Sequence, residues 1–80
     1  MEAKKVKMVF EEIDLANENL EEDEVLFVEI TNYANEQFAI PFNECQNISD
    51  EEVVQFYANR KWRTISYSDI TDIHYVVDYC

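Results

Sequence analysis

The residues with the greatest potential for chemistry are the carboxylates crowded into "DLANENLEEDEVLFVEI", residues 14–30. No Lys or Arg lies among these seventeen residues, which contain seven acids: Asp14, Glu18, Glu21, Glu22, Asp23, Glu24 and Glu29. Carboxylates at this density could hold a hard cation such as Ca²⁺, exchange protons as catalytic acids and bases or contact a basic surface. The stretch also contains an apolar run typical of a strand, so the charge must be tolerated beside a segment that folds.

The gap in positive charge extends well beyond that stretch. From Met8 to Asn59 there is no Lys, Arg or His, and this range holds fourteen of the eighteen acids. The six bases form two clusters: Lys4, Lys5 and Lys7, and Arg60, Lys61 and Arg63. A net charge of about 2 to 8 in magnitude is enough to keep a small domain in solution, whereas this chain carries −12. Since self-repulsion lowers the stability of a compact state, the excess charge needs a functional explanation.

Length and composition predict a single folded domain over residues 1–80. The apolar fraction of 48%, with five Phe, five Tyr and one Trp, is too high for a disordered acidic tail. We expect no secretory leader and no membrane span, because no apolar run is long enough. Cys45 and Cys80 match no metal or redox spacing, so we expect reduced thiols and a cytoplasmic protein. Glycine is absent, which excludes glycine-rich phosphate loops and leaves the turn positions to Asn.

The pattern of apolar residues predicts an α+β fold. Alternation of Val6, Met8 and Phe10 indicates a strand over about 4–12, and β-branched and aromatic residues indicate strands at 24–33, 36–42 and 61–67. Ser49 and Glu52 form a capping box that predicts a helix over 49–60. Residues 68–80 fit either a helix capped by Ser68 or a strand, and their composition favours the strand. We therefore expect a small antiparallel sheet of about five strands (β-β-β-α-β-β) with one helix packed on a face.

Metal binding and catalysis find little support in the spacing. An EF-hand loop beginning at Asp14 would place Ala16, Asn19 and Val25 at its positions 3, 6 and 12, where an oxygen ligand, Gly and Glu are required. The single histidine, His74, could act as a general base with Asp72 as its orienting partner. Cys45, Ser66, Ser68 or Cys80 would then be the nucleophile, but no spacing supports such a set. We expect a protein that is not an enzyme and that needs no metal or cofactor.

Direct binding of nucleic acid is disfavoured because the summed charge repels phosphate. The same charge fits a basic protein surface. Same-face residues of a strand repeat at ~6.6–6.8 Å, close to the separation of ~6–7 Å between phosphates on one DNA strand. The candidate contact residues are acids with two tyrosine anchors: Glu18, Glu21, Glu22, Asp23, Glu24, Glu29, Glu36, Glu44, Tyr33 and Tyr57.

A short glycine-free chain with "NLEEDEVLFVEI" and "ISDEEVVQFYANR" in an acidic α+β arrangement resembles the small phage-encoded host-takeover and anti-defence proteins of the DNA-mimic type. That class includes inhibitors of restriction enzymes, CRISPR effectors, uracil-DNA glycosylase and the bacterial nucleoid protein HU. The resemblance is one of size, charge and composition. It implies a non-catalytic inhibitor in the host cell that presents carboxylates to a basic DNA-binding protein and blocks its DNA binding.

Two other functions remain open at this point. An immunity protein or antitoxin that neutralises a basic toxin would also need acids and aromatic anchors. The chain would also fit a small acidic phage protein whose charge serves solubility, or an acidic subunit of a larger assembly. We also expect a homodimer, because closed two-fold assemblies are common and two copies would extend the acidic surface.

Overall fold

The computed structural model describes all residues, 1–80, as one α-helix and six strands. The elements are α1 (Ala3–Glu18), β1 (Glu24–Asn32), β2 (Gln37–Pro41), β3 (Cys45–Ile48), β4 (Val53–Ala58), β5 (Lys61–Ser66) and β6 (Ile70–Tyr79). Single 3-10 turns, η1 (Phe42–Glu44) and η2 (Tyr67–Asp69), precede β3 and β6. The helix is neither long enough nor apolar enough to cross a membrane.

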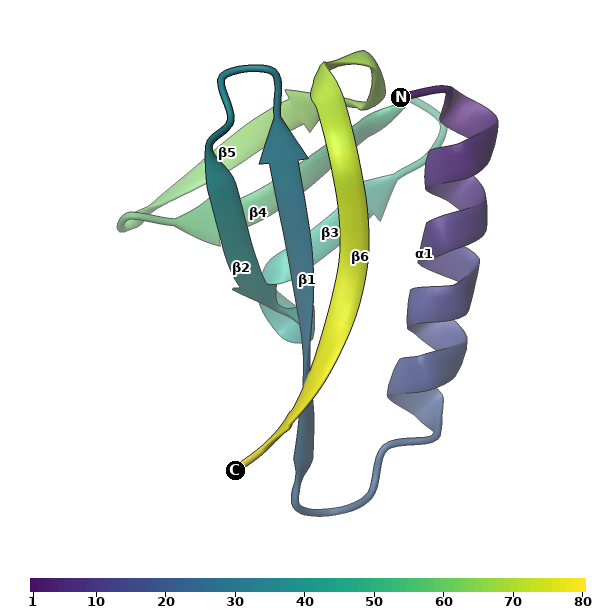
Figure 1. Cartoon of the computed structure of the whole chain (residues 1–80), viewed down its shortest axis with the longest axis vertical. Helices are drawn as coiled ribbons and strands as arrows, with labels where there is room; N and C mark the ends of the chain where they lie inside the picture. The colour runs from purple at the N-terminus through teal and green to yellow at the C-terminus, as the bar shows by residue number, and fades with distance from the viewer.

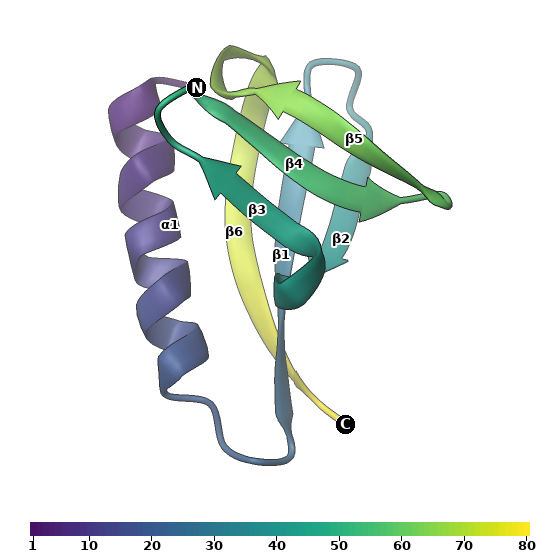
Figure 2. The same ribbon diagram turned by 180° about the vertical axis from the view of Figure 1, so that it is seen from behind.

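The strands form two three-stranded antiparallel sheets, in the orders β2-β1-β6 and β3-β4-β5. The sheets stack face to face with their strands crossing at a large angle, and α1 runs along the side where β6 and β3 lie (Figure 1 and, from behind, Figure 2). Such crossed packing gives two sheets a shared interior that is open at its corners. The expected class, α+β with one helix packed against antiparallel strands, is confirmed, but the strands form two sheets of three instead of one sheet of about five, and the helix precedes all of them.

The core consists of thirteen buried residues, all apolar or aromatic. Strand β1 supplies Leu26, Val28 and Ile30 at alternate positions, as the period of two for a half-buried strand requires. The helix closes the open side of the sheets with Val6, Phe10 and Ile13. No charged side chain is buried, so the acidic residues all lie outside the core.

The prediction of a strand over 4–12 was wrong, because these residues belong to α1. Val6 and Phe10 fit both an alternating pattern with Met8 and a helical pattern with Ile13. The structure buries Ile13 together with Val6 and Phe10, and leaves Met8 outside the core. Met8 is 53% exposed. The lysines and glutamates between the apolar positions are good helix formers, and they face the solvent.

The prediction of a helix over 49–60 was also wrong. Residues 49–52 form the turn between β3 and β4, in which Glu52 adopts a positive φ of 54°, a backbone conformation that no helix N-terminus uses. The following residues alternate in burial, with Val54 and Phe56 inside and Tyr57 outside. Strand β4 pairs with a strand on each side. The packing of its β-branched and aromatic residues in the sheet therefore outweighs the local preference of the capping box for a helix.

The remaining strand predictions are confirmed. The segments 24–33, 36–42 and 61–67 contain β1, β2 and β5, and 68–80 contains β6 rather than a helix. Pro41 ends β2, which is an edge strand of its sheet, as a residue without a backbone N–H requires. Strand β3 was not expected from the sequence. It is only four residues long and has no pattern that marks it as a strand.

Asparagine takes over turn positions that glycine occupies in most proteins, as expected. Asn35, in the β1–β2 turn, and Asn59, in the β4–β5 turn, have φ of 60° and 55°. Arg60 follows Asn59 with φ of 67°. Two successive residues with positive φ are typical of the turn type that matches the twist of a two-residue β-hairpin.

The helix depends on its buried stripe for its place on the sheets, which gives a direct test of the fold. Phe10→Ala is expected to lower the free energy of unfolding by about 3–5 kcal/mol, a large part of the roughly 4–12 kcal/mol expected for a domain of this size. Met8→Ala, at an exposed position of the same helix, should change it by no more than about 0.5 kcal/mol. Urea denaturation followed by circular dichroism measures both. Equal effects would contradict this placement of the helix.

Candidate functional site

The densest group of carboxylates lies at the end of the molecule where α1 connects to β1. We call this group the acidic end and define it by Glu18, Glu21, Glu22, Asp23, Glu24 and Asp78. The antiparallel pairing of β1 with β6 sets Val25 opposite Asp78 and Glu24 opposite Tyr79. The end of β6 therefore reaches the α1–β1 connection, at the bottom of Figure 1. Asp78 joins acids from which it is more than fifty residues distant in sequence.

The backbone of the acidic end is held in place by hydrogen bonds. The Glu21 N–H donates to Glu24 Oε1 at 2.8 Å, and the Glu24 N–H donates to the Glu21 carbonyl at 3.1 Å. The Cys80 N–H donates to the Asp23 carbonyl at 2.8 Å, which ties the end of β6 to the connection. A surface ordered in advance loses less conformational entropy on binding than a flexible acidic tail.

The carboxylates of the protein are not neutralised by its own lysines and arginines. No Lys or Arg nitrogen lies within 4.0 Å of a carboxylate oxygen, and the only two ion pairs involve His74. The cluster of Arg60, Lys61 and Arg63 forms no pair with any acid of the protein. The negative charge is therefore available to a partner.

Three of the predicted acids lie away from the acidic end. Glu29 is five residues beyond Glu24 on β1, which is about 17 Å along the strand and on the opposite face. Glu36 lies in the β1–β2 turn and accepts a hydrogen bond from Asn32 Nδ2 at 3.0 Å. Glu44 lies in η1. The single extended row of carboxylates that the spacing predicts does not form, because β1 presents alternate residues to opposite faces.

The two tyrosines proposed as anchors lie on different hairpins. Tyr33 is at the β1–β2 turn and is 71% exposed. Tyr57 lies on β4 and contacts Trp62 of β5 edge to face, with 5.7 Å between ring centroids. Both can reach a partner, but neither belongs to the acidic end.

His74 forms a charged cluster with Asp72, the partner that the sequence suggested, and with Glu29, which sequence reasoning missed. Its Nε2 lies 2.7 Å from Glu29 Oε1, and its Nδ1 lies 2.9 Å from Asp72 Oδ2. Both ring nitrogens donate only in the imidazolium form, so these two contacts favour a protonated histidine. Glu29 and His74 are partners in the β1–β6 register. The contact between Glu29 and His74 could be recognised only from the pairing of β1 with β6, because 45 positions separate the two residues in the sequence.

The hydrogen bonds to Asp72 and then to Glu29 raise the pKa of His74 above its ordinary value. The side chain is 52% exposed, so solvent weakens the attraction. The cluster reduces the negative charge of this sheet face when His74 is protonated, and restores it when His74 loses its proton.

The two cysteines differ in environment. Cys45 is half-buried at the start of β3, and this burial raises the pKa of its thiol to about 12. Cys80 is exposed. A thiol with so high a pKa supplies almost no thiolate near neutral pH, which argues against Cys45 as a nucleophile.

No family model, curated protein or solved structure matches this chain. The charge and geometry of the surface are therefore the features from which a function can be inferred.

The cluster around His74 makes a prediction about pH. A two-dimensional NMR titration should give His74 a pKa above the ordinary value of about 6.5, and Glu29→Gln and Asp72→Asn should each lower it. Because the folded-state pKa is raised, the cluster should stabilise the fold fully below the ordinary pKa. That contribution should be lost as pH rises through the folded-state pKa. A His74 pKa that neither substitution changes would show that the two carboxylates do not hold the imidazolium.

The cysteines offer a separate test of the packing. In the native protein at pH 8, Ellman's reagent should modify Cys80 rapidly and Cys45 slowly, because Cys45 is half-buried and its thiol stays protonated. In denaturant both should react at similar rates. The variants Cys45→Ser and Cys80→Ser assign the two reactions, and fast native reaction of Cys45 would contradict the burial of β3.

Proposed function

We propose that this protein is a non-catalytic inhibitor of a basic DNA-binding protein, to which it presents carboxylates in place of DNA phosphates. The observation that carries the proposal is the unpaired charge. Eighteen acids face solvent or the periphery of the core, and none has a Lys or Arg partner within 4.0 Å. A charge kept unpaired at a cost in stability is explained if it is the binding surface.

The size of the molecule supports this proposal. Its longest dimension is 34 Å, similar to one turn of B-DNA at ~34 Å. One such turn carries about twenty phosphates over its two strands, and the protein carries eighteen acids and a net charge of −12. The charge of the protein per unit length is thus of the same order as that of DNA, which suits a partner surface that normally binds duplex DNA.

The acidic end is the part of the surface best suited to contact the partner. It combines six carboxylates from α1, the α1–β1 connection, β1 and β6 with a backbone held by hydrogen bonds. Basic surfaces attract such a group over long distances, which raises the association rate at low salt. Tyr33 and Tyr57 are exposed, and tyrosine is a frequent hot-spot residue at protein interfaces.

The inhibitor would act inside a bacterial host cell. The partner would be a bacterial nucleoid protein such as HU, or a defence nuclease such as a restriction or CRISPR effector, in the cytoplasm of the host cell. A homodimer would present two acidic ends and lengthen the charged surface. The protein itself would neither contact DNA nor use a cofactor.

A charge reversal at the acidic end tests the proposal. Glu18→Lys/Glu22→Lys should slow association with the basic partner about tenfold at ~50 mM salt and less at ~300 mM, because the contribution is electrostatic. The partner is first isolated from nuclease-treated bacterial lysate on the immobilised protein. Surface plasmon resonance at both salt concentrations then gives the association rates.

The matched control changes the same amount of charge elsewhere. Asp50→Lys/Glu51→Lys alters the β3–β4 turn, at the opposite end of the molecule from the α1–β1 connection (Figures 1 and 2). This variant should associate at nearly the normal rate, and duplex DNA should displace the wild-type protein from the partner. Equal losses in both variants would show that only net charge matters, and a complex that DNA leaves intact would contradict DNA mimicry.

A further inference from the structure

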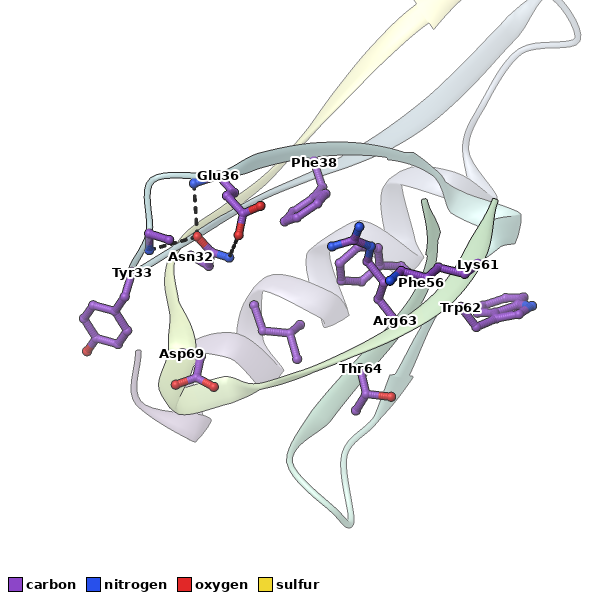
Figure 3. Close-up of a pocket in the computed structure, with 12 residues that line it drawn as sticks. Asn32, Tyr33, Glu36, Phe38, Phe56, Lys61, Trp62, Arg63, Thr64 and Asp69 are labelled. Atoms are coloured by element: carbon purple, nitrogen blue, oxygen red, sulfur yellow. Dashed lines mark hydrogen bonds between the residues drawn. The ribbon is translucent and has the colours of Figure 1, made fainter. Parts of the chain in front are cut away.

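A hollow of ≈520 Å³ lies between the β1–β2 hairpin and β5, away from the acidic end (Figure 3). We call it the Arg63 hollow. Its apolar part is formed by Phe38, Phe56 and Ile65, and its polar part includes Lys61, Arg63 and Glu36. Sites for small molecules commonly have volumes of ~300–1,000 Å³, with apolar walls and a few polar groups.

The inward-facing positions of β5 carry charge where an apolar residue is usual. Strand residues alternate between faces, so Lys61 and Arg63 point the same way as the buried Ile65. Arg63 is the β-sheet partner of the buried Phe56. Figure 3 shows both cationic side chains directed into the hollow, while Trp62 and Tyr33 border it on opposite sides. The strand thus brings two cations to an apolar floor.

The guanidinium of Arg63 has no anionic partner. Its Cζ lies 5.5 Å from the centroid of the Phe38 ring, a cation–π contact. Its Nε is buried and makes no hydrogen bond, and no carboxylate oxygen lies within 4.0 Å of any Arg nitrogen. A buried donor without a partner is costly, so an acceptor bound in the hollow would relieve that cost.

Two carboxylates limit how much negative charge the hollow can accept. Glu36 and Asp69 lie on the side opposite Arg63 and Lys61 (Figure 3). The hydrogen bond from Asn32 holds Glu36 toward the hairpin. A singly charged ligand can place its anionic group on Arg63 and keep its neutral part near these acids, whereas a more highly charged ligand is repelled. The acids elsewhere contribute little at physiological salt, because screening acts over about 8 Å.

We propose that the Arg63 hollow is a binding site for a small monocarboxylate with an apolar body. The carboxylate accepts hydrogen bonds from the fork of the Arg63 guanidinium, and Lys61 adds a second positive charge. The apolar body lies against Phe38, Phe56 and Ile65. This site is separate from the acidic end and shares with the proposed contact surface, the acidic end with Tyr33 and Tyr57, only Tyr33, at its border.

Benzoate is the probe, titrated into ¹⁵N-labelled protein at ~150 mM salt and pH 7 and followed by NMR. We expect saturable shifts of the Arg63 Nε–H signal and of the Phe38 and Ile65 amides, with a dissociation constant in the millimolar range typical of a small fragment. Benzamide, which lacks the charge, should not bind. Inorganic phosphate should bind at least about tenfold more weakly, since it carries more charge.

Two substitutions and a matched control assign the effect to Arg63. Arg63→Gln should abolish binding, and Arg63→Lys should weaken it about tenfold because the paired hydrogen bonds are lost. The second variant decides the question if the first does not fold. Arg60→Gln, which removes a neighbouring charge that does not line the hollow, should bind benzoate normally. Absence of shifts at the hollow, equal binding of phosphate, or an equal loss in Arg60→Gln would overturn the proposal.

Discussion

The pairing of β1 with β6 is the interaction on which most features of this protein depend. It joins residues 24–32 to residues 70–79 in one antiparallel ladder, and β1 also pairs with β2 to complete the sheet. The same ladder places Asp78 at the acidic end, sets His74 beside Glu29 and ties Cys80 to Asp23. A shift of one residue would turn each of these side chains to the other face. The buried alternate residues of β1 prevent such a shift, so the core determines the charge pattern of the surface.

The core and the surface make opposing contributions to stability. Thirteen buried residues, none of them charged, supply the apolar burial, while a net charge of −12 opposes compaction. The structure reduces the conflict by keeping most of the acids at turns, on the solvent face of α1 and at strand ends, where water screens them. Glu29 and Asp72 lie within strands, beside His74. The one histidine lies between two carboxylates, and it is the only cationic side chain that offsets acid charge directly.

The molecule has two regions of different electrostatic character. The acidic end gathers carboxylates that have no Lys or Arg partner, and it suits a large basic surface. The Arg63 hollow gathers two cations and an apolar floor, and it suits a small anion. They lie at the two ends of β1, one at the α1–β1 connection and the other beside the β1–β2 turn. The two regions can therefore be tested separately by substitutions at each end.

The sequence alone identified the segments that contain β1, β2, β5 and β6, because their β-branched and aromatic residues are dense and bounded by polar turns. It indicated the α+β class as well, but with the helix at 49–60, where β4 lies, and a strand at 4–12, where α1 lies. It also placed Glu18 and Glu21 to Glu24 together, since neighbours in sequence stay neighbours in any fold. The other features depend on contacts between segments that are distant in sequence. The first apolar segment fits a strand through Val6, Met8 and Phe10 as well as a helix through Val6, Phe10 and Ile13. The capping box at Ser49 favoured a helix in a segment that pairs with β3 and β5 as strand β4. Local patterns were ambiguous in both places, and contacts with distant segments settled them. The place of Asp78, the contact of His74 with Glu29 and the Arg63 hollow became visible only through strand pairing, because each joins residues far apart in sequence, whose proximity depends on sheet register.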